Sequence, residues 1–92
     1  MSSLIIANFN LLDQEKLAQY GAAAAVTIAN YGGEFIAKGQ SNNMSGDSDY
    51  TMAAVIQFAD KETATKWYKS PEYQAIIPLR DEAMDSQFLL VG

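Results

Sequence analysis

The order of two hydrophobic patterns constrains the fold of this chain more than any other feature. Short apolar runs at residues 4–9, 34–39, 52–58 and 88–91 have the composition and alternating faces that are typical of strands. Residues 13–31 and 60–84 instead carry apolar side chains at helical spacing. We therefore predict the order strand, helix, strand, strand, helix, strand, with a polar loop at residues 40–49.

The predicted helices have recognisable ends. Asp13 and Asp60 are expected to be N-caps, because their carboxylates can accept hydrogen bonds from free backbone N–H groups. Gly32 is expected to end the first helix in a left-handed conformation. Ser70-Pro71 should interrupt the second helix, because a residue that precedes proline is pushed out of the helical region. Pro78 should bend or interrupt the helical segment that continues to residue 84.

These elements predict an α+β protein of ferredoxin-like βαββαβ architecture, with both helices on one face of a four-stranded antiparallel sheet. The alanines at residues 22–25 should let the first helix approach that sheet closely. The opposite sheet face would carry Ile6, Ile36 and Val55, and is too apolar to sit in water. We expect two copies to pack these faces together as a homodimer, a dimeric α+β barrel.

Length and composition limit the function. At 92 residues we expect a single domain, residues 1–92, with a thin core that favours association. Eleven acidic against six basic residues give a net charge of −5, which argues against nucleic-acid binding. We expect no signal peptide and no membrane span, and hence a cytoplasmic protein. Without cysteine or histidine, we predict neither a metal site nor a cofactor.

Three polar residues interrupt otherwise apolar strands and are candidates for lining a ligand cavity. They are Asn8, Lys38 and Gln57, and alternation along the strands places them in one layer, on the sheet face of the predicted barrel. A buried polar group needs a hydrogen-bonding partner, and a ligand would supply one. The alternative is that these side chains bond to one another or to water, or that Lys38 extends to the barrel mouth.

The least generic stretch is residues 67–74, with Arg80 shortly beyond it. Trp67, Tyr68 and Tyr73 are candidates for one end of a ligand cavity, and Tyr20 of the first helix is a further candidate contact. Arg80 could hold an anionic group of a ligand, or pair with Glu72 or Asp81. A tryptophan before a proline break is also a common anchor for packing a helix on a sheet. Ser70 has no histidine to act as its base, so we exclude a serine nucleophile.

Together these residues resemble the DUF1330 family of the dimeric α+β barrel superfamily. The motifs that carry the resemblance are Asp13, Tyr20, Tyr31-Gly32-Gly33-Glu34-Phe35, Lys38-Gly39, Val55-Ile56-Gln57-Phe58, Ala64, Trp67-Tyr68-Lys69-Ser70-Pro71-Glu72-Tyr73-Gln74 and Arg80. The resemblance covers nearly the whole chain and implies the fold and the dimer. It implies no activity, because the family is one of unknown function. This chain has Lys38 and Gln57 where the family usually has arginine and glutamate, which removes a bidentate ion pair.

Three functions fit these observations. The first is a homodimeric domain that binds a small aromatic or anionic metabolite in the barrel cavity. The second is a cofactor-free enzyme, because the resemblance extends to monooxygenases and isomerases that act on small aromatic or lactone substrates. The third is a structural or interaction protein with a filled barrel. No residue pattern identifies a catalytic group, so the sequence leaves enzyme activity open.

Overall fold

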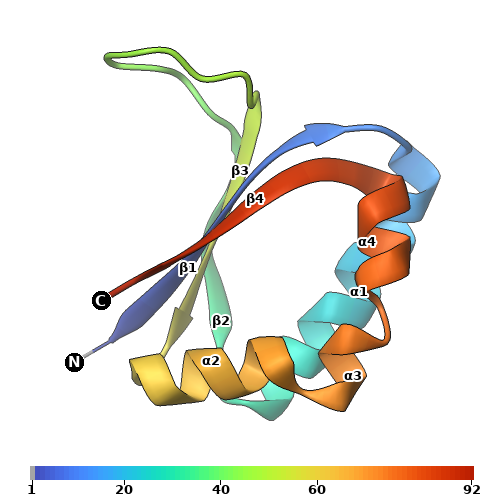
Figure 1. Ribbon diagram of the computed structural model, residues 1–92, viewed down its shortest axis with the longest axis vertical. Helices are drawn as coiled ribbons and strands as arrows, with labels where there is room; N and C mark the ends of the chain where they lie inside the picture. The colour runs from blue at the N-terminus through green and yellow to red at the C-terminus, as the bar shows by residue number, and fades with distance from the viewer. Residues whose placement is uncertain (1) are drawn as a thin grey trace.

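The computed structural model describes residues 2–92. The elements follow in the order β1 (Ser3–Leu11), α1 (Gln14–Asn30), β2 (Glu34–Gln40), β3 (Met52–Phe58), α2 (Lys61–Lys69), α3 (Pro71–Gln74), α4 (Ile77–Ala83) and β4 (Met84–Val91). The four strands form one antiparallel sheet in the order β2-β3-β1-β4. The helices all cover one face of it, and the two termini lie side by side (Figure 1). This confirms the predicted α+β architecture.

The predicted helix ends are confirmed. The carboxylate of Asp13 accepts a hydrogen bond from the backbone N–H of Lys16, at 3.0 Å, and Asp60 accepts one from Thr63, at 2.7 Å. Gly32, just after α1, has φ of +71°, a conformation that costs glycine little. Within residues 2–92, no helix has the length and apolar character that a bilayer crossing requires.

The connection from β3 to β4, the second crossover, consists of three short helices because the chain is interrupted at Ser70-Pro71 and again before Pro78. Ser70 ends α2 by donating its hydroxyl to the carbonyl of Trp67, at 2.7 Å, and begins α3 by accepting from the backbone N–H of Tyr73, at 3.2 Å. Pro71 occupies the first turn of α3, where its missing N–H costs nothing. Pro78 occupies the first turn of α4 in the same way.

Strand β4 begins four residues earlier than predicted. The sequence assigned Met84 to a helix and began the strand at residue 88, whereas Met84 already pairs with Leu11 of β1. Residues 84–87 lack an apolar alternation that would mark them as a strand. Pairing with the long central strand β1 supplies their backbone hydrogen bonds and overrides the local pattern.

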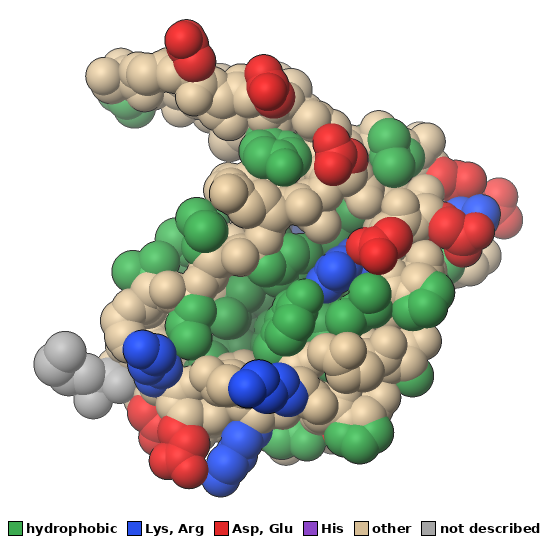
Figure 2. All heavy atoms as spheres, in the orientation of Figure 1, with side chains coloured by type: hydrophobic (Ala, Val, Ile, Leu, Met, Phe, Trp, Pro, Cys, Tyr) green, Lys and Arg blue, Asp and Glu red, His purple; other side chains and the backbone are tan. Residues whose placement is uncertain are grey.

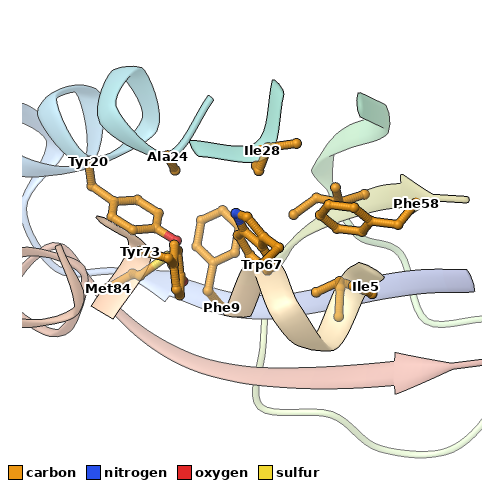
Figure 3. Close-up of a cluster of buried hydrophobic side chains, with 11 residues drawn as sticks. Ile5, Phe9, Tyr20, Ala24, Ile28, Phe58, Trp67, Tyr73 and Met84 are labelled. Carbon is orange, nitrogen blue, oxygen red and sulfur yellow. The ribbon is translucent and has the colours of Figure 1, made fainter. Parts of the chain in front are cut away.

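The core lies between α1, α2 and the sheet (Figure 3). Trp67 is fully buried and packs against Phe58 and Tyr73, with ring centroids 5.3 and 4.3 Å apart. Its indole N–H donates to the hydroxyl of Thr27 on α1, at 3.0 Å, which pins α2 to α1. Trp67 is therefore the packing anchor that the sequence offered as the alternative to a ligand contact.

The predicted strand faces hold for β1 and β3 but fail for Lys38. Register shifts at Ile36, so that Ala37 pairs with Val55 and Lys38 with Ala54. The extra residue turns Lys38 onto the helix-covered face, which the simple alternation had assigned to its neighbour. The prediction that Asn8, Lys38 and Gln57 share one face was wrong: Asn8 and Gln57 lie on the open face, and Lys38 lies opposite.

Candidate functional site

A cavity of about 660 Å³ lies between α1 and the sheet. Its walls come from the inner face of all four strands and from the sheet-facing side of α1. The lining is formed by Ala7, Phe9, Gln14, Leu17, Ala18, Tyr20, Gly21, Ala22, Ala24, Ala25, Ile28, Phe35, Lys38, Gly39, Met52, Ala54, Ile56, Met84 and Phe88. A volume in the hundreds of Å³ with mostly apolar walls is typical of a site for a small organic molecule.

Small side chains explain why this space stays open. On the sheet, Ala7 and Ala54 are direct cross-strand neighbours at the cavity wall. On α1, Gly21 and the alanines at positions 18, 22 and 25 face them, and a methyl group built on Gly21 would meet nothing within 4 Å. The sequence predicted that the alanines would bring α1 close to the sheet, and this was wrong. A cavity separates these alanines from the sheet.

Lys38 is the only charged residue among the described residues that line the cavity. Its side chain is exposed, and its ammonium lies 4.9 Å from the centroid of the Phe35 ring. It therefore stands where the cavity meets solvent, with an aromatic face beside its charge. Such a cation attracts an anionic group of a molecule whose apolar part is buried deeper.

A hydrogen-bonded network of three phenols and one guanidinium joins α1 to the second crossover. We call Tyr20, Tyr68, Tyr73 and Arg80 the tyrosine–arginine network. Arg80 Nη1 donates to the hydroxyls of Tyr68, at 3.0 Å, and Tyr73, at 3.2 Å. The hydroxyls of Tyr73 and Tyr20 lie 2.7 Å apart, and Figure 3 shows them pointing toward each other. Of these four residues, only Tyr20 is among the described residues that line the cavity.

Burial controls the protonation of this network. It raises the pKa of the Tyr20 hydroxyl above its ordinary value, and the neighbouring Tyr73 adds to the effect. Burial also raises the pKa of Tyr73, although the hydrogen bond from Arg80 and its positive charge act in the opposite direction. Both phenols are therefore neutral at physiological pH, whereas the guanidinium is charged.

Arg80 is held firmly in place. Its side chain is only 11% exposed, Nε donates to Asp81 at 3.2 Å, and its guanidinium carbon lies 4.8 Å from the centroid of the Phe88 ring. Of the two acidic partners considered from the sequence, Asp81 is the one it meets. Glu72 instead accepts a hydrogen bond from Tyr31, at 2.8 Å. Arg80 is thus connected to the cavity wall by hydrogen bonds through Tyr73 and Tyr20.

The candidates on the open sheet face lie away from the cavity. Asn8 pairs with Ala53 and Gln87, and Gln57 donates its amide to the hydroxyl of Ser2, at 2.8 Å. The two positions are well separated, because Gln57 pairs with the start of β1 and Asn8 lies near its far end. Any ligand role for Asn8 or Gln57 thus requires a site on the open face.

A second, smaller cavity of about 280 Å³ lies between α2 and β4. Tyr68 lines it with Phe88 and other residues of the two elements. Figure 2 shows hydrophobic side chains gathered in the hollow between this strand and the helices. Tyr68 and Phe88 also contact Arg80, so this cavity adjoins the tyrosine–arginine network, and Phe88 lines both cavities.

Two features of the site were not found from the sequence. Thr27 supports Trp67, and the methionines at positions 52 and 84 line the cavity. A threonine within the apolar stripe of a helix was the available signal for the first.

Within residues 2–92, acidic side chains form no cluster that could hold a metal ion.

Solved structures of similar fold are known from several bacteria. A protein of unknown function from Rhodopseudomonas palustris has a TM-score of 0.79 at 16% identity, over 98% of this chain and 80% of that one. The cofactor-independent oxygenase SnoaB from Streptomyces nogalater has a TM-score of 0.73 at 13% identity, over 99% and 91% of the two chains. A dimeric ferredoxin-like protein of unknown function from Thermobifida fusca has a TM-score of 0.65 at 16% identity, over 100% and 91%.

These similarities establish the ferredoxin-like fold. A comparison with curated proteins gave no match. The model of the domain of unknown function DUF1330 matches residues 2–92, which is nearly the whole sequence. This chain therefore belongs to the DUF1330 family.

Proposed function

We propose that this protein is a homodimeric domain that binds a small aromatic molecule with an anionic group. The molecule lies in the cavity between α1 and the sheet, with its anionic group beside Lys38. The observation that carries this proposal is the apolar cavity of about 660 Å³ with one cation where it meets solvent. Aromatic side chains at positions 9, 35 and 88 would contact a flat ring system.

The open sheet face supports the homodimer. Ala37, Val55, Ile6 and Leu89 form one continuous apolar row across all four strands. Leu89 is 41% exposed, and the helices leave this face uncovered (Figure 1). A second copy of the same face would bury the row, and the similar protein from Thermobifida fusca is described as dimeric.

The binding test uses 2-naphthoate and its neutral counterpart 2-naphthamide as probes, with the thermal midpoint and a titration as readouts. We expect 2-naphthoate to raise the midpoint and to bind more tightly than 2-naphthamide. Lys38→Met should abolish that preference while leaving binding of the amide unchanged. Lys66→Met is the matched control, because Lys66 pairs with Glu62 on α2 at 3.2 Å and does not line the cavity.

A second variant shows where the probe binds. Gly21→Trp should abolish binding of both probes, because the indole would occupy the space beside Gly21. Val26→Trp places the same side chain on α1 at a position that is 62% exposed, and it should leave the affinity for both probes unchanged. If neither probe binds the wild type, the proposal is overturned in favour of a structural or interaction protein with a filled barrel.

A cofactor-free oxygenase or isomerase is the second candidate. It is favoured by the neutral phenol of Tyr20 at the wall of an apolar cavity, where a hydroxyl can stabilise developing negative charge on a substrate oxygen. The likeness to SnoaB at 13% identity concerns the fold. Turnover of a bound hydroxynaphthalene or lactone probe by the wild type, lost in Gly21→Trp but kept in Val26→Trp, would identify an enzyme.

A further inference from the structure

The hydrogen bonds of the tyrosine–arginine network restrict which ligand the cavity accepts, a conclusion that rests on the proposed binding function. Tyr20 and Tyr73 each have one hydroxyl proton, and their mutual hydrogen bond uses only one of the two. Within residues 2–92, neither hydroxyl has another acceptor. One proton is therefore left to donate elsewhere.

Arg80 determines which proton that is. It donates to the Tyr73 oxygen, so a second donation from Tyr20 would leave the Tyr73 proton without a partner inside the core, among rings of Trp67 and Tyr68. The opposite direction avoids this. Tyr73, polarised by the guanidinium, donates to Tyr20, and successive bonds in one direction strengthen one another. Tyr20 then retains the free proton.

The free proton belongs to the one member of the network that lines the cavity. We propose that the Tyr20 hydroxyl donates a hydrogen bond to a neutral carbonyl oxygen of the bound molecule, so that the cavity selects aromatic carbonyl compounds. A carbonyl fits this position better than an anion does, because Tyr20 is 7% exposed and the charge of Arg80 lies beyond Tyr73. Burying an anion at this end would cost far more than burying a neutral acceptor.

The chemistry of the ligand is therefore specified at two places. Lys38, exposed where the cavity meets solvent, favours an anionic group, and Tyr20, buried in the wall, favours a carbonyl. The side chains that line the space between them are predominantly apolar. An aromatic ring system with an acyl group on one side and an anionic substituent on another satisfies both.

The test compares 2-acetylnaphthalene with 2-ethylnaphthalene, in which a methylene group replaces the carbonyl. A hydrogen bond between neutral groups contributes about 1 kcal/mol, so we expect the ketone to bind roughly fivefold more tightly. Tyr20→Phe keeps the ring in the wall and removes the hydroxyl, and should reduce this ratio to about one. Tyr31→Phe is the matched control, because the Tyr31 hydroxyl bonds to Glu72 outside the cavity.

A spectroscopic readout separates donation from a structural role of Tyr20. With the ketone labelled at its carbonyl carbon, the ¹³C chemical shift should move downfield on binding to the wild type and to Tyr31→Phe. It should move less on binding to Tyr20→Phe at equal saturation. Tyr73→Phe should retain part of the shift, because it removes the polarising donor but leaves the Tyr20 proton.

The outcomes separate this inference from the proposed function. If none of 2-naphthoate, 2-naphthamide, 2-acetylnaphthalene and 2-ethylnaphthalene binds the wild type, both proposals are overturned. If 2-naphthoate binds but 2-acetylnaphthalene does not, only the carbonyl donor is overturned. Binding that Gly21→Trp abolishes, with equal affinity for ketone and hydrocarbon, would keep the cavity as a binding site and overturn the carbonyl donor. A preference that survives Tyr20→Phe and disappears in Lys38→Met or Tyr73→Phe would assign the donor to another residue and also overturn it.

Discussion

Gly21 and Gly33 differ in the space that surrounds their α-carbons, although both lie near the buried face of α1. A methyl group on Gly21 meets nothing within 4 Å, because it projects into the cavity. A methyl group on Gly33 would lie 2.5 Å from the Phe58 ring and 2.9 Å from Ile28. The first glycine leaves open space in the cavity, and the second lets β2 begin close against the core.

We predict opposite effects of alanine at these two positions. Gly21→Ala should raise the free energy of unfolding by about 0.4–1 kcal/mol, because alanine restricts the unfolded chain and fits the helix without strain. Gly33→Ala should lower it by about 1–3 kcal/mol, because Phe58 and Ile28 must move. Urea titrations at one protein concentration measure both. A destabilised Gly21→Ala would mean that the space beside α1 is smaller than the structure shows.

For single residues, the sequence identified candidate side chains better than it predicted which residues they contact. Tyr20 and Arg80 were named as candidate ligand contacts, but their connection through Tyr73 depends on three elements meeting in space. Lys38 was singled out for its charge on a strand. It was assigned to the wrong face of the sheet, because a single extra residue at Ile36 reverses the alternation. No local signal in residues 34–40 marks that shift.

Among the elements, the junction of α2 and α3 depends most on one side chain. The Ser70 hydroxyl is buried and serves both helices, donating to the carbonyl of Trp67 and accepting from the N–H of Tyr73. Because Trp67 and Tyr73 belong to the core, this junction positions both the packing anchor and one member of the tyrosine–arginine network.

Ser70→Ala should therefore destabilise the protein by about 1 kcal/mol or somewhat more, since it removes a cap and leaves the N–H of Tyr73 without its acceptor. The carbonyl of Trp67 loses one of its two donors and keeps the backbone N–H of residue 70, at 3.1 Å. Thr65→Ala is the control. The Thr65 hydroxyl donates to the carbonyl of Lys61 on the exposed side of α2, where water can replace it, so a change within about 0.5 kcal/mol is expected. Equal effects of the two substitutions in chemical denaturation would contradict the double role of Ser70.

Elements with regular patterns were predictable, and those set by tertiary pairing were not. Residues 52–58 alternate cleanly and form β3 with the predicted bounds. Residues 84–87 have no such pattern, and only the long β1 beside them makes them a strand. The cavity was likewise not predictable, because an alanine-rich helix is compatible both with close packing on the sheet and with an open space beside it.

The whole molecule presents two sheet faces with different neighbours. The helices cover one face, and the cavity lies on that side. The other carries the apolar row of Ala37, Val55, Ile6 and Leu89, flanked by polar side chains such as Gln57 and Gln87. A chain of 92 residues buries a modest share of its surface alone, about 60–65%. Pairing through this row would add apolar burial without occupying the cavity beside α1.

The homodimer can be tested by placing a charge in the middle of this row. Val55→Asp should convert the protein to monomers, because an unpaired carboxylate between two apolar sheets costs several kcal/mol. Val26→Asp makes the same change on the exposed side of α1 and should leave a dimer. Sedimentation velocity at several concentrations measures the assembly, and circular dichroism checks that both variants are folded. A folded Val55→Asp variant that still sediments as a dimer would place the interface elsewhere, because two copies cannot bury this row against each other when it contains an unpaired aspartate.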